Sequence, residues 1–216
     1  MVSMYWVVLV KKILFIISLF GFFSFSTFAT ERVLSLSLTS NYVFRGITQT
    51  NDKAAVQANY RLSQSEDSGF YAGFFASNVA QGAEVDIFGG LKLAFGDQSK
   101  FIIDLGAVEY LYTDNNFKNI HHEFYAGAQY EMSYLKYYFG ENEARYLDIG
   151  TGFKVLGGMD LLLHFGEVFA TAQNGNDISI SLQKDFGRTK LGVTATYEDK
   201  TTTKESEFFG FISVAF

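Results

Sequence analysis

The chain has 216 residues, a length that suits one domain, and 48% of them are hydrophobic. It contains no proline and no cysteine but 24 phenylalanines, 13 tyrosines and 20 glycines, which favours strands and excludes disulfides, thiol nucleophiles and thiolate metal sites. The formal net charge of −6 argues against nucleic acid as a partner.

Residues 1–29 have the order of a secretory signal peptide. Lys11 and Lys12 precede a nearly continuous apolar run over 13–23, and small residues lead to Ala29. The run is short for a spanning helix and ends in small polar residues, so an uncleaved anchor is the less favoured alternative. We predict cleavage after Ala29, which leaves a mature chain of residues 30–216.

The mature chain follows a period of two rather than 3.6. At its start Leu34, Leu36 and Leu38 alternate with serine and threonine, which gives a strand one apolar face and one polar face. The same alternation predicts twelve strands at 33–45, 54–64, 70–79, 84–95, 101–112, 122–132, 134–140, 145–155, 160–168, 177–186, 190–198 and 207–216.

The connections between these strands alternate in length. Short turns such as 65–69 and 187–189 follow every second strand, whereas longer loops such as 46–53 and 113–121 follow the others; the link at 80–83 is a short exception. This pattern is typical of antiparallel up-and-down barrels of bacterial outer membranes. An even count of strands puts both termini on the short-turn, periplasmic side.

Alternation alone does not say which face points outward, because a soluble barrel would hide its apolar face inside. The polar face carries Asp86, Lys92 and Asp104 within strands, so water must reach it, while the other face carries large apolar residues that suit hydrocarbon. We therefore predict an all-β transmembrane barrel of about twelve strands. It would lie in the outer membrane of a Gram-negative bacterium, against outer-membrane lipid and lipopolysaccharide.

The last strand ends at Phe216. A terminal phenylalanine on such a strand resembles the signal by which the barrel-assembly machinery recognises its substrates, and an ordinary edge strand is the less favoured alternative. An open edge in lipid leaves unpaired backbone groups, so the twelfth strand must pair with the first.

The segment SNYVFRGITQTNDKAAVQ, followed by GFYAGFFASNV, resembles the start of the TorF family of porins, which has a similar strand, tyrosine-arginine-glycine turn and third strand. The likeness is strongest from Leu36 to Val79 and continues through VDIFGGLKLAF, DLGAVEYLY, HEFYAGAQY and YLDIGTGF. Family members often have proline after the first loop, where this chain has Lys53, Ala54 and Ala55, a departure that concerns loop geometry. The resemblance implies a porin and carries over no substrate and no functional residue.

Tyr42, Arg45 and Gly46 are expected to end the first strand at the outer rim. Arg45 either sets a local field at the pore mouth or, as the favoured alternative, pairs with carboxylates across the lumen and braces the barrel. The candidate pore-lining residues are Arg45, Arg61, Asp86, Lys92, Asp104, Glu123, Lys136, Asp148 and His164.

Acidic residues outnumber basic ones on the predicted inner face. Five inward positions are basic: Arg45, Arg61, Lys92, Lys136 and Lys154. Eleven are acidic: Glu84, Asp86, Asp104, Glu123, Glu131, Asp148, Asp160, Asp177, Asp185, Glu198 and Glu207. An open lumen would therefore favour cations weakly, because acidic walls concentrate positive ions.

Catalytic chemistry has little support in the sequence. The only histidines are His121, His122 and His164; adjacent strand residues point to opposite faces, which spoils a two-histidine metal site. A lipid-modifying barrel enzyme is therefore the least favoured function, and we predict no catalytic, cofactor or metal site. Passive diffusion of small polar solutes is the leading function, and a non-conducting structural or surface-binding barrel is the alternative.

Glu109 does not fit the alternation. It falls on the lipid-facing phase with Leu105 and Ala107, where a charge is costly away from the interface. We predict a β-bulge near Val108 that turns Glu109 inward and Tyr110 outward.

Overall fold

The computed structural model describes residues 31–96, 101–113, 120–140, 144–169, 174–200 and 204–216. The predicted signal peptide over 1–29 lies outside these ranges. Among the described residues, no helix has the length and apolar character needed to cross a membrane.

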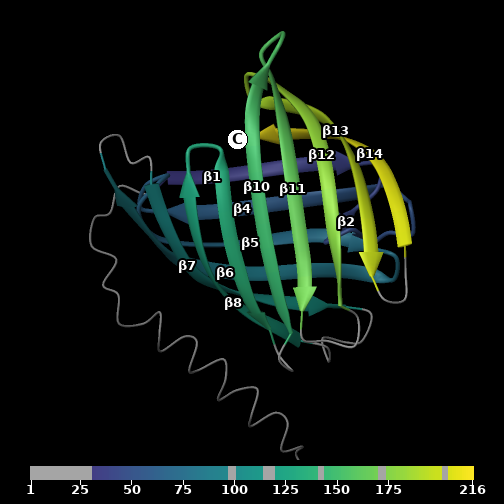
Figure 1. The fold of residues 1–216 in the computed structure, drawn as a ribbon, viewed down its shortest axis with the longest axis horizontal. Coiled ribbons are helices and arrows are strands. Elements are labelled where there is room, and N and C mark those ends of the chain that lie inside the picture. The colour runs from purple at the N-terminus through teal and green to yellow at the C-terminus, as the bar shows by residue number, and fades with distance from the viewer. Residues whose placement is uncertain (1–30, 97–100, 114–119, 141–143, 170–173, 201–203) are drawn as a thin grey trace, which may run out of the picture.

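Twelve strands form one closed antiparallel barrel, with neighbours in the chain also neighbours in the sheet. The strands are β1 (Glu31–Thr39), β4 (Ala55–Ser63), β5 (Gly69–Val79), β6 (Gly82–Phe95), β7 (Phe101–Tyr112), β8 (Ile120–Tyr130), β9 (Ser133–Gly140), β10 (Arg145–Val155), β11 (Met159–Phe169), β12 (Gly175–Phe186), β13 (Thr189–Lys200) and β14 (Lys204–Ala215). In Figure 1, strands β10 to β13 lie across β1, β4, β5 and β6, as the two opposite walls of a barrel with tilted strands do. The predicted fold and strand count are confirmed.

The barrel closes where β14 pairs with β1. Ser35 faces Ala215 and Thr39 faces Phe211, and the backbone N–H of Phe216 donates to the carbonyl of Leu34 at 2.8 Å. The Ser37 and Ser213 hydroxyls meet at 2.8 Å across this seam. Closure pairs the two outermost strands, so their backbone groups are not exposed to lipid.

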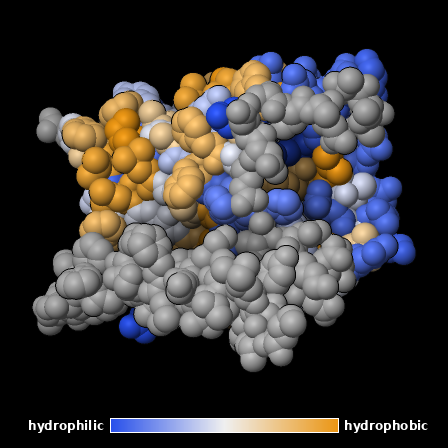
Figure 2. Space-filling view, turned by 90° about the horizontal axis from the view of Figure 1, so that it is seen from below, coloured by the Kyte–Doolittle hydropathy of each residue, from blue (hydrophilic) through white to orange (hydrophobic). Residues whose placement is uncertain are grey.

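The outer face of the barrel is apolar. Val56 and Phe124 are 65% and 60% exposed, and leucines and phenylalanines of the same phase lie exposed on every wall. Figure 2 shows hydrophobic residues gathered on one part of this face and hydrophilic residues toward the opposite edge. Carboxylates such as Asp104 and Asp177 are buried on the inner face. An apolar exterior around an ionic interior is the arrangement of an outer-membrane barrel, so the predicted location is confirmed.

Two local predictions are wrong. The first strand ends at Thr39 rather than at residue 45, and a separate two-stranded sheet, β2 (Val43–Phe44) and β3 (Ile47–Thr48), follows it. Strand β7, which is described over its whole length, keeps one register with both neighbours from Phe101 onward and therefore has no bulge near Val108.

The uninterrupted register of β7 fixes the direction of two side chains. Glu109 stays on the outer face, opposite Ile87 and His122. Tyr110 points inward, where its hydroxyl donates to Glu123 at 2.9 Å. The inward turn predicted for Glu109 is therefore also wrong.

Candidate functional site

The loop between β1 and β4 folds into the barrel as a hairpin. Its two short strands enclose a two-residue turn, Arg45 and Gly46, whose φ angles are 50° and 81°. Positive φ at both central residues is the pattern of a type I′ turn, which glycine adopts without steric cost. We call residues 43–48 the lumen hairpin.

Asn41 fixes the base of the lumen hairpin. This residue is 4% exposed, and its amide nitrogen donates to Asp52 and to Glu207 of β14, each at 3.0 Å. Its amide oxygen accepts hydrogen bonds from the hydroxyls of Thr48 and Thr50 at 2.7 and 3.0 Å. A fully bonded side-chain amide thus joins both arms of the loop to the barrel wall.

Arg45 at the tip reaches β8. Its guanidinium donates two hydrogen bonds to the Glu123 carboxylate at 2.8 and 2.7 Å, and it lies 4.1 Å from the ring centroid of Tyr146 and 5.1 Å from that of Tyr138. Burial would lower the pKa of Arg45, but hydrogen bonding to Glu123 and its negative charge raise the pKa above its ordinary value. The guanidinium therefore stays charged.

Gly46 packs against β12 and β13. A Cβ atom on this glycine would lie 2.9 Å from the Cβ atoms of both Asp177 and Glu198, so only glycine fits. The Lys200 ammonium donates to the Arg45 carbonyl at 3.1 Å and lies 3.3 Å from Glu198. In the closed sheet β8 lies five places from β1 in one direction and seven in the other, almost halfway around the barrel. The lumen hairpin therefore spans the lumen from one wall to the other.

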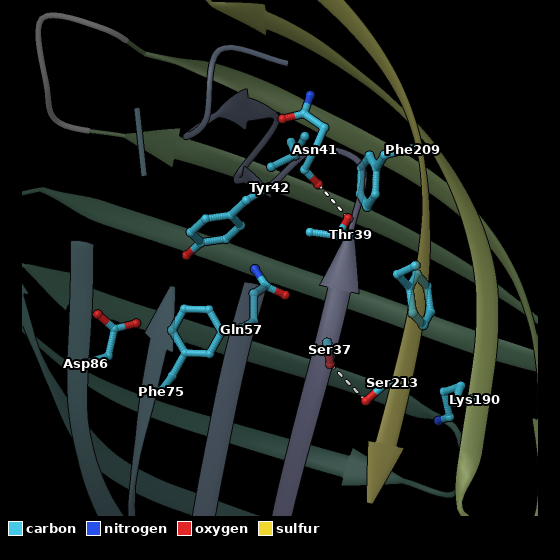
Figure 3. A pocket seen from close by; sticks show the side chains of 12 residues that line it. Ser37, Thr39, Asn41, Tyr42, Gln57, Phe75, Asp86, Lys190, Phe209 and Ser213 are labelled. Atoms are coloured by element: carbon cyan, nitrogen blue, oxygen red, sulfur yellow. Dashed lines mark hydrogen bonds between the residues drawn. The ribbon is translucent and has the colours of Figure 1, made fainter. Parts of the chain in front are cut away.

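Two cavities border the lumen hairpin. The larger, about 470 Å³, touches Asn41, Tyr42 and Val43; its other lining residues come from β1, β4, β5, β6, β13 and β14 (Figure 3). The smaller, about 240 Å³, touches Phe44 and Arg45 and is also lined by His121 and Glu123. The lumen is thus divided rather than filled.

The predicted pore-lining residues form several groups on the inner wall. Arg45 pairs with Glu123, an arrangement that fits the bracing alternative. The Lys136 ammonium lies 2.8 Å from the Asp104 carboxylate, which also accepts a hydrogen bond from Tyr71 at 2.7 Å. The Lys136–Asp104 pair joins β9 to β7, whereas the Arg45–Glu123 pair joins the lumen hairpin to the far wall.

The remaining candidates do not form a single group. A His164 ring nitrogen lies 3.1 Å from Asp148, and the other lies 3.5 Å from Asp177. Lys92 donates to the Glu66 carbonyl at 3.1 Å, Arg61 lies on β4 opposite Gly73, and Asp86 borders the larger cavity. In the described ranges, no group of three or more histidine, cysteine, aspartate or glutamate side chains could hold a metal ion.

Sequence reasoning missed Tyr146, and it placed Tyr42 and Gly46 at the outer rim at the end of the first strand rather than in a loop inside the lumen. Alternation at Tyr42 and Phe44 continues the period of the first strand, and so it hides the strand's end. The available signal was local: a glycine directly after Arg45, followed by polar Thr48 and Thr50, is typical of a tight turn.

Comparisons with known proteins agree with this architecture. The KdgM porin superposes with a TM-score of 0.65 at 9% identity, over 85% of this chain and 99% of that one. The COG4313 outer membrane channel from Pseudomonas putida F1 gives a TM-score of 0.51 at 10% identity, over 89% of this chain and 96% of that one. At such identities the likeness concerns the fold. No curated protein sequence matches the chain. The model of a family described as "Bacterial protein of unknown function (Gcw_chp)" matches residues 27–211, and the chain therefore belongs to that family.

Proposed function

We propose that this protein is an outer-membrane porin through which small polar solutes diffuse passively, with a weak preference for cations. The observation that carries the proposal is the partly open lumen: a cavity of about 470 Å³ remains beside the lumen hairpin, lined by charged, hydroxyl, amide and apolar side chains. The resemblance to TorF porins and the folds of the two channel proteins above support the same class of function.

The cation preference rests on the charges of the wall. Glu84 and Asp86 lie two residues apart on one face of β6, and among the described residues neither forms a salt bridge. Arg45, by contrast, is neutralised by Glu123. Uncompensated carboxylates raise the local concentration of cations. In this proposal the residues predicted to line the pore act through the charge and size of their side chains. The lumen hairpin sets the narrowest point of the pore.

Planar-bilayer recording on the refolded mature chain, residues 30–216, tests both parts of the proposal. We expect discrete single-channel currents. Across a KCl gradient, we expect the reversal potential to shift from zero toward the equilibrium potential of potassium. Currents with a clear chloride preference would contradict the cation preference but would still support the proposal of a channel.

The second candidate is a non-conducting barrel that presents its loops at the cell surface. The observation that favours it is the lumen hairpin itself, which spans the lumen and is held at its tip by Glu123 and Lys200. No current at any voltage from a correctly folded barrel would favour this candidate. Turnover of lipid substrates by the same preparation would instead favour the third candidate, a lipid-modifying enzyme.

Assembly and membrane partners follow from the same proposal. The barrel would contact outer-membrane lipid and lipopolysaccharide through its apolar face, and Phe216 would serve as the signal read by the barrel-assembly machinery. The exposed position of the Phe216 side chain at the end of β14 leaves it accessible for that role.

A further inference from the structure

The larger cavity combines a buried carboxylate with aromatic side chains. Asp86 is 8% exposed, and its Oδ1 atom has no hydrogen-bond partner within the described part of the chain. Tyr42 and Phe75 lie beside it, with ring centroids 5.7 Å apart, and Figure 3 shows the Asp86 carboxylate on the same side of the cavity as both rings. A buried carboxylate is costly to ionise without a cationic partner, so a positively charged occupant would be stabilised at this position.

The opposite side of the cavity adds apolar surface. Phe209 and Phe211 of β14 line it, although most of the inner wall is polar. Their phase is fixed by the register: Phe211 faces Thr39 across the seam, on the same face as the Ser37 and Ser213 pair. Phenylalanines on a wall that must contact water are explained by a ligand with its own apolar part.

The charged side chains around the cavity disfavour an anionic ligand. Lys190, which supplies the cationic group in the described lining of the cavity, lies across it from Asp86, and its ammonium lies 3.7 Å from Asp185. Hydroxyl and amide groups, including Ser37 and Gln57, supply the remaining polar surface. The volume of about 470 Å³ falls within the range of about 300–1,000 Å³ typical of small-molecule pockets.

From this arrangement we infer that the larger cavity binds small organic ammonium ions, with the ammonium at Asp86 and the alkyl part against Phe75 and Phe209. Aromatic faces attract ammonium groups as well as alkyl chains, so the cavity selects such ions over K⁺, which gains no apolar contact. As a solute class for the channel, this inference rests on the proposed function; as a binding site, it does not need conduction.

Titration of n-butylammonium into the refolded mature protein in neutral detergent, followed by saturation-transfer-difference NMR, tests the inference. We expect saturable binding to the wild type and much weaker binding of n-butanol, which has the same chain without the charge. The Asp86→Asn variant should bind n-butylammonium about tenfold more weakly or worse, because a charge-assisted hydrogen bond is lost. The matched control is Asp160→Asn, which removes another buried inward carboxylate, one that pairs with Lys154 and does not line the cavity.

Each outcome separates the two proposals. Equal binding of n-butanol and n-butylammonium, or unchanged binding by Asp86→Asn, overturns the inference even if the protein conducts. Saturable, Asp86-dependent binding in a barrel that passes no current supports the site and contradicts the channel. The n-butanol comparison uses the wild-type protein alone, so the test stands even if a variant fails to fold.

Discussion

Arg45 on the lumen hairpin and Glu123 on β8 form a bidentate salt bridge although 78 residues separate them in the sequence. Both side chains are largely shielded from water, and Tyr110 donates a further hydrogen bond to the same carboxylate. Paired geometry of this kind holds planar groups in one orientation. The salt bridge therefore holds the hairpin across the lumen.

Replacing Arg45 with alanine should widen the channel. Breaking a buried ion pair by removing one partner costs about 3–5 kcal/mol, and here the cost acts on docking of the hairpin rather than on the strands. We expect a higher single-channel conductance than wild type in planar bilayers. The shift in gel migration on heating should match that of the wild type. Arg188→Ala, at an exposed turn, should conduct like the wild type. Unchanged conductance in Arg45→Ala would remove the hairpin from the permeation path.

Gly46→Ala should displace the tip of the lumen hairpin. The added methyl group meets Asp177 and Glu198, and the positive φ adds about 1–2 kcal/mol of backbone strain. Trypsin should then cleave after Arg45 in the variant and spare that bond in the wild type. Gly96→Ala is the matched control, since Gly96 has a φ of 83° but a methyl group added there meets no atom of the described chain within 4 Å. If trypsin still failed to cleave after Arg45 in Gly46→Ala, the barrel wall rather than the hairpin would have moved to accommodate the methyl group.

Neutralising Glu84 and Asp86 together should reduce the cation preference. These carboxylates have no cationic partner in the described part of the chain, so in the proposed pore their charge would favour cations. The ratio of potassium to chloride permeability, from reversal potentials, should fall toward one. Glu109→Gln removes a carboxylate from the outer face of the neighbouring strand and should leave the ratio unchanged.

Glu109→Leu and Glu123→Leu should differ sharply in stability. Glu109 lies on the outer face, and its replacement should change the free energy of unfolding by no more than about 1 kcal/mol. Glu123→Leu leaves Arg45 without its partner, which should cost about 3–5 kcal/mol of docking free energy. Urea unfolding of the refolded proteins, combined with trypsin cleavage at Arg45, measures both effects. A large loss of stability in Glu109→Leu would restore an inward position for that residue.

Deleting Phe216 should impair assembly more than stability. The deletion removes one hydrogen bond to Leu34, worth about 1 kcal/mol, together with an exposed ring. We expect a reduced yield in the outer membrane of the expressing cell but normal refolding in detergent. Equal losses in both assays would assign Phe216 a structural role only.

Strand positions could be predicted from the sequence because lipid and water impose opposite demands on alternate residues. Leu36 and Ser37, or Leu105 and Asp104, differ so strongly in polarity that the period of two fixes their faces. Glu109 shows the limit of this reasoning: a single charge suggested a bulge, yet eleven regular pairs with β8 outweigh the cost of one outward carboxylate.

The lumen hairpin could not be predicted, because its position depends on residues distant in the chain. Tyr42 and Phe44 continue the alternation of β1, and no local pattern states that Arg45 meets Glu123 or that Gly46 meets Asp177. Alternation identified many charged residues of the inner wall, but it missed Lys190 and Lys200 and wrongly placed Glu131 inward, which lies in the turn after β8. It gave no pairing between these charges. Pairing follows from the barrel's curvature, which brings opposite walls within reach of one loop.

The order of assembly follows from where the lumen hairpin binds. Residues 43–48 are synthesised before β4 and all later strands, yet their partners belong to β8, β12 and β13. The hairpin therefore has nothing to dock against until most of the wall exists, and its docking must be a late event in folding. A barrel arrested before β13 joins the sheet would have a vacant interior, so closure of the sheet and division of its interior are completed together.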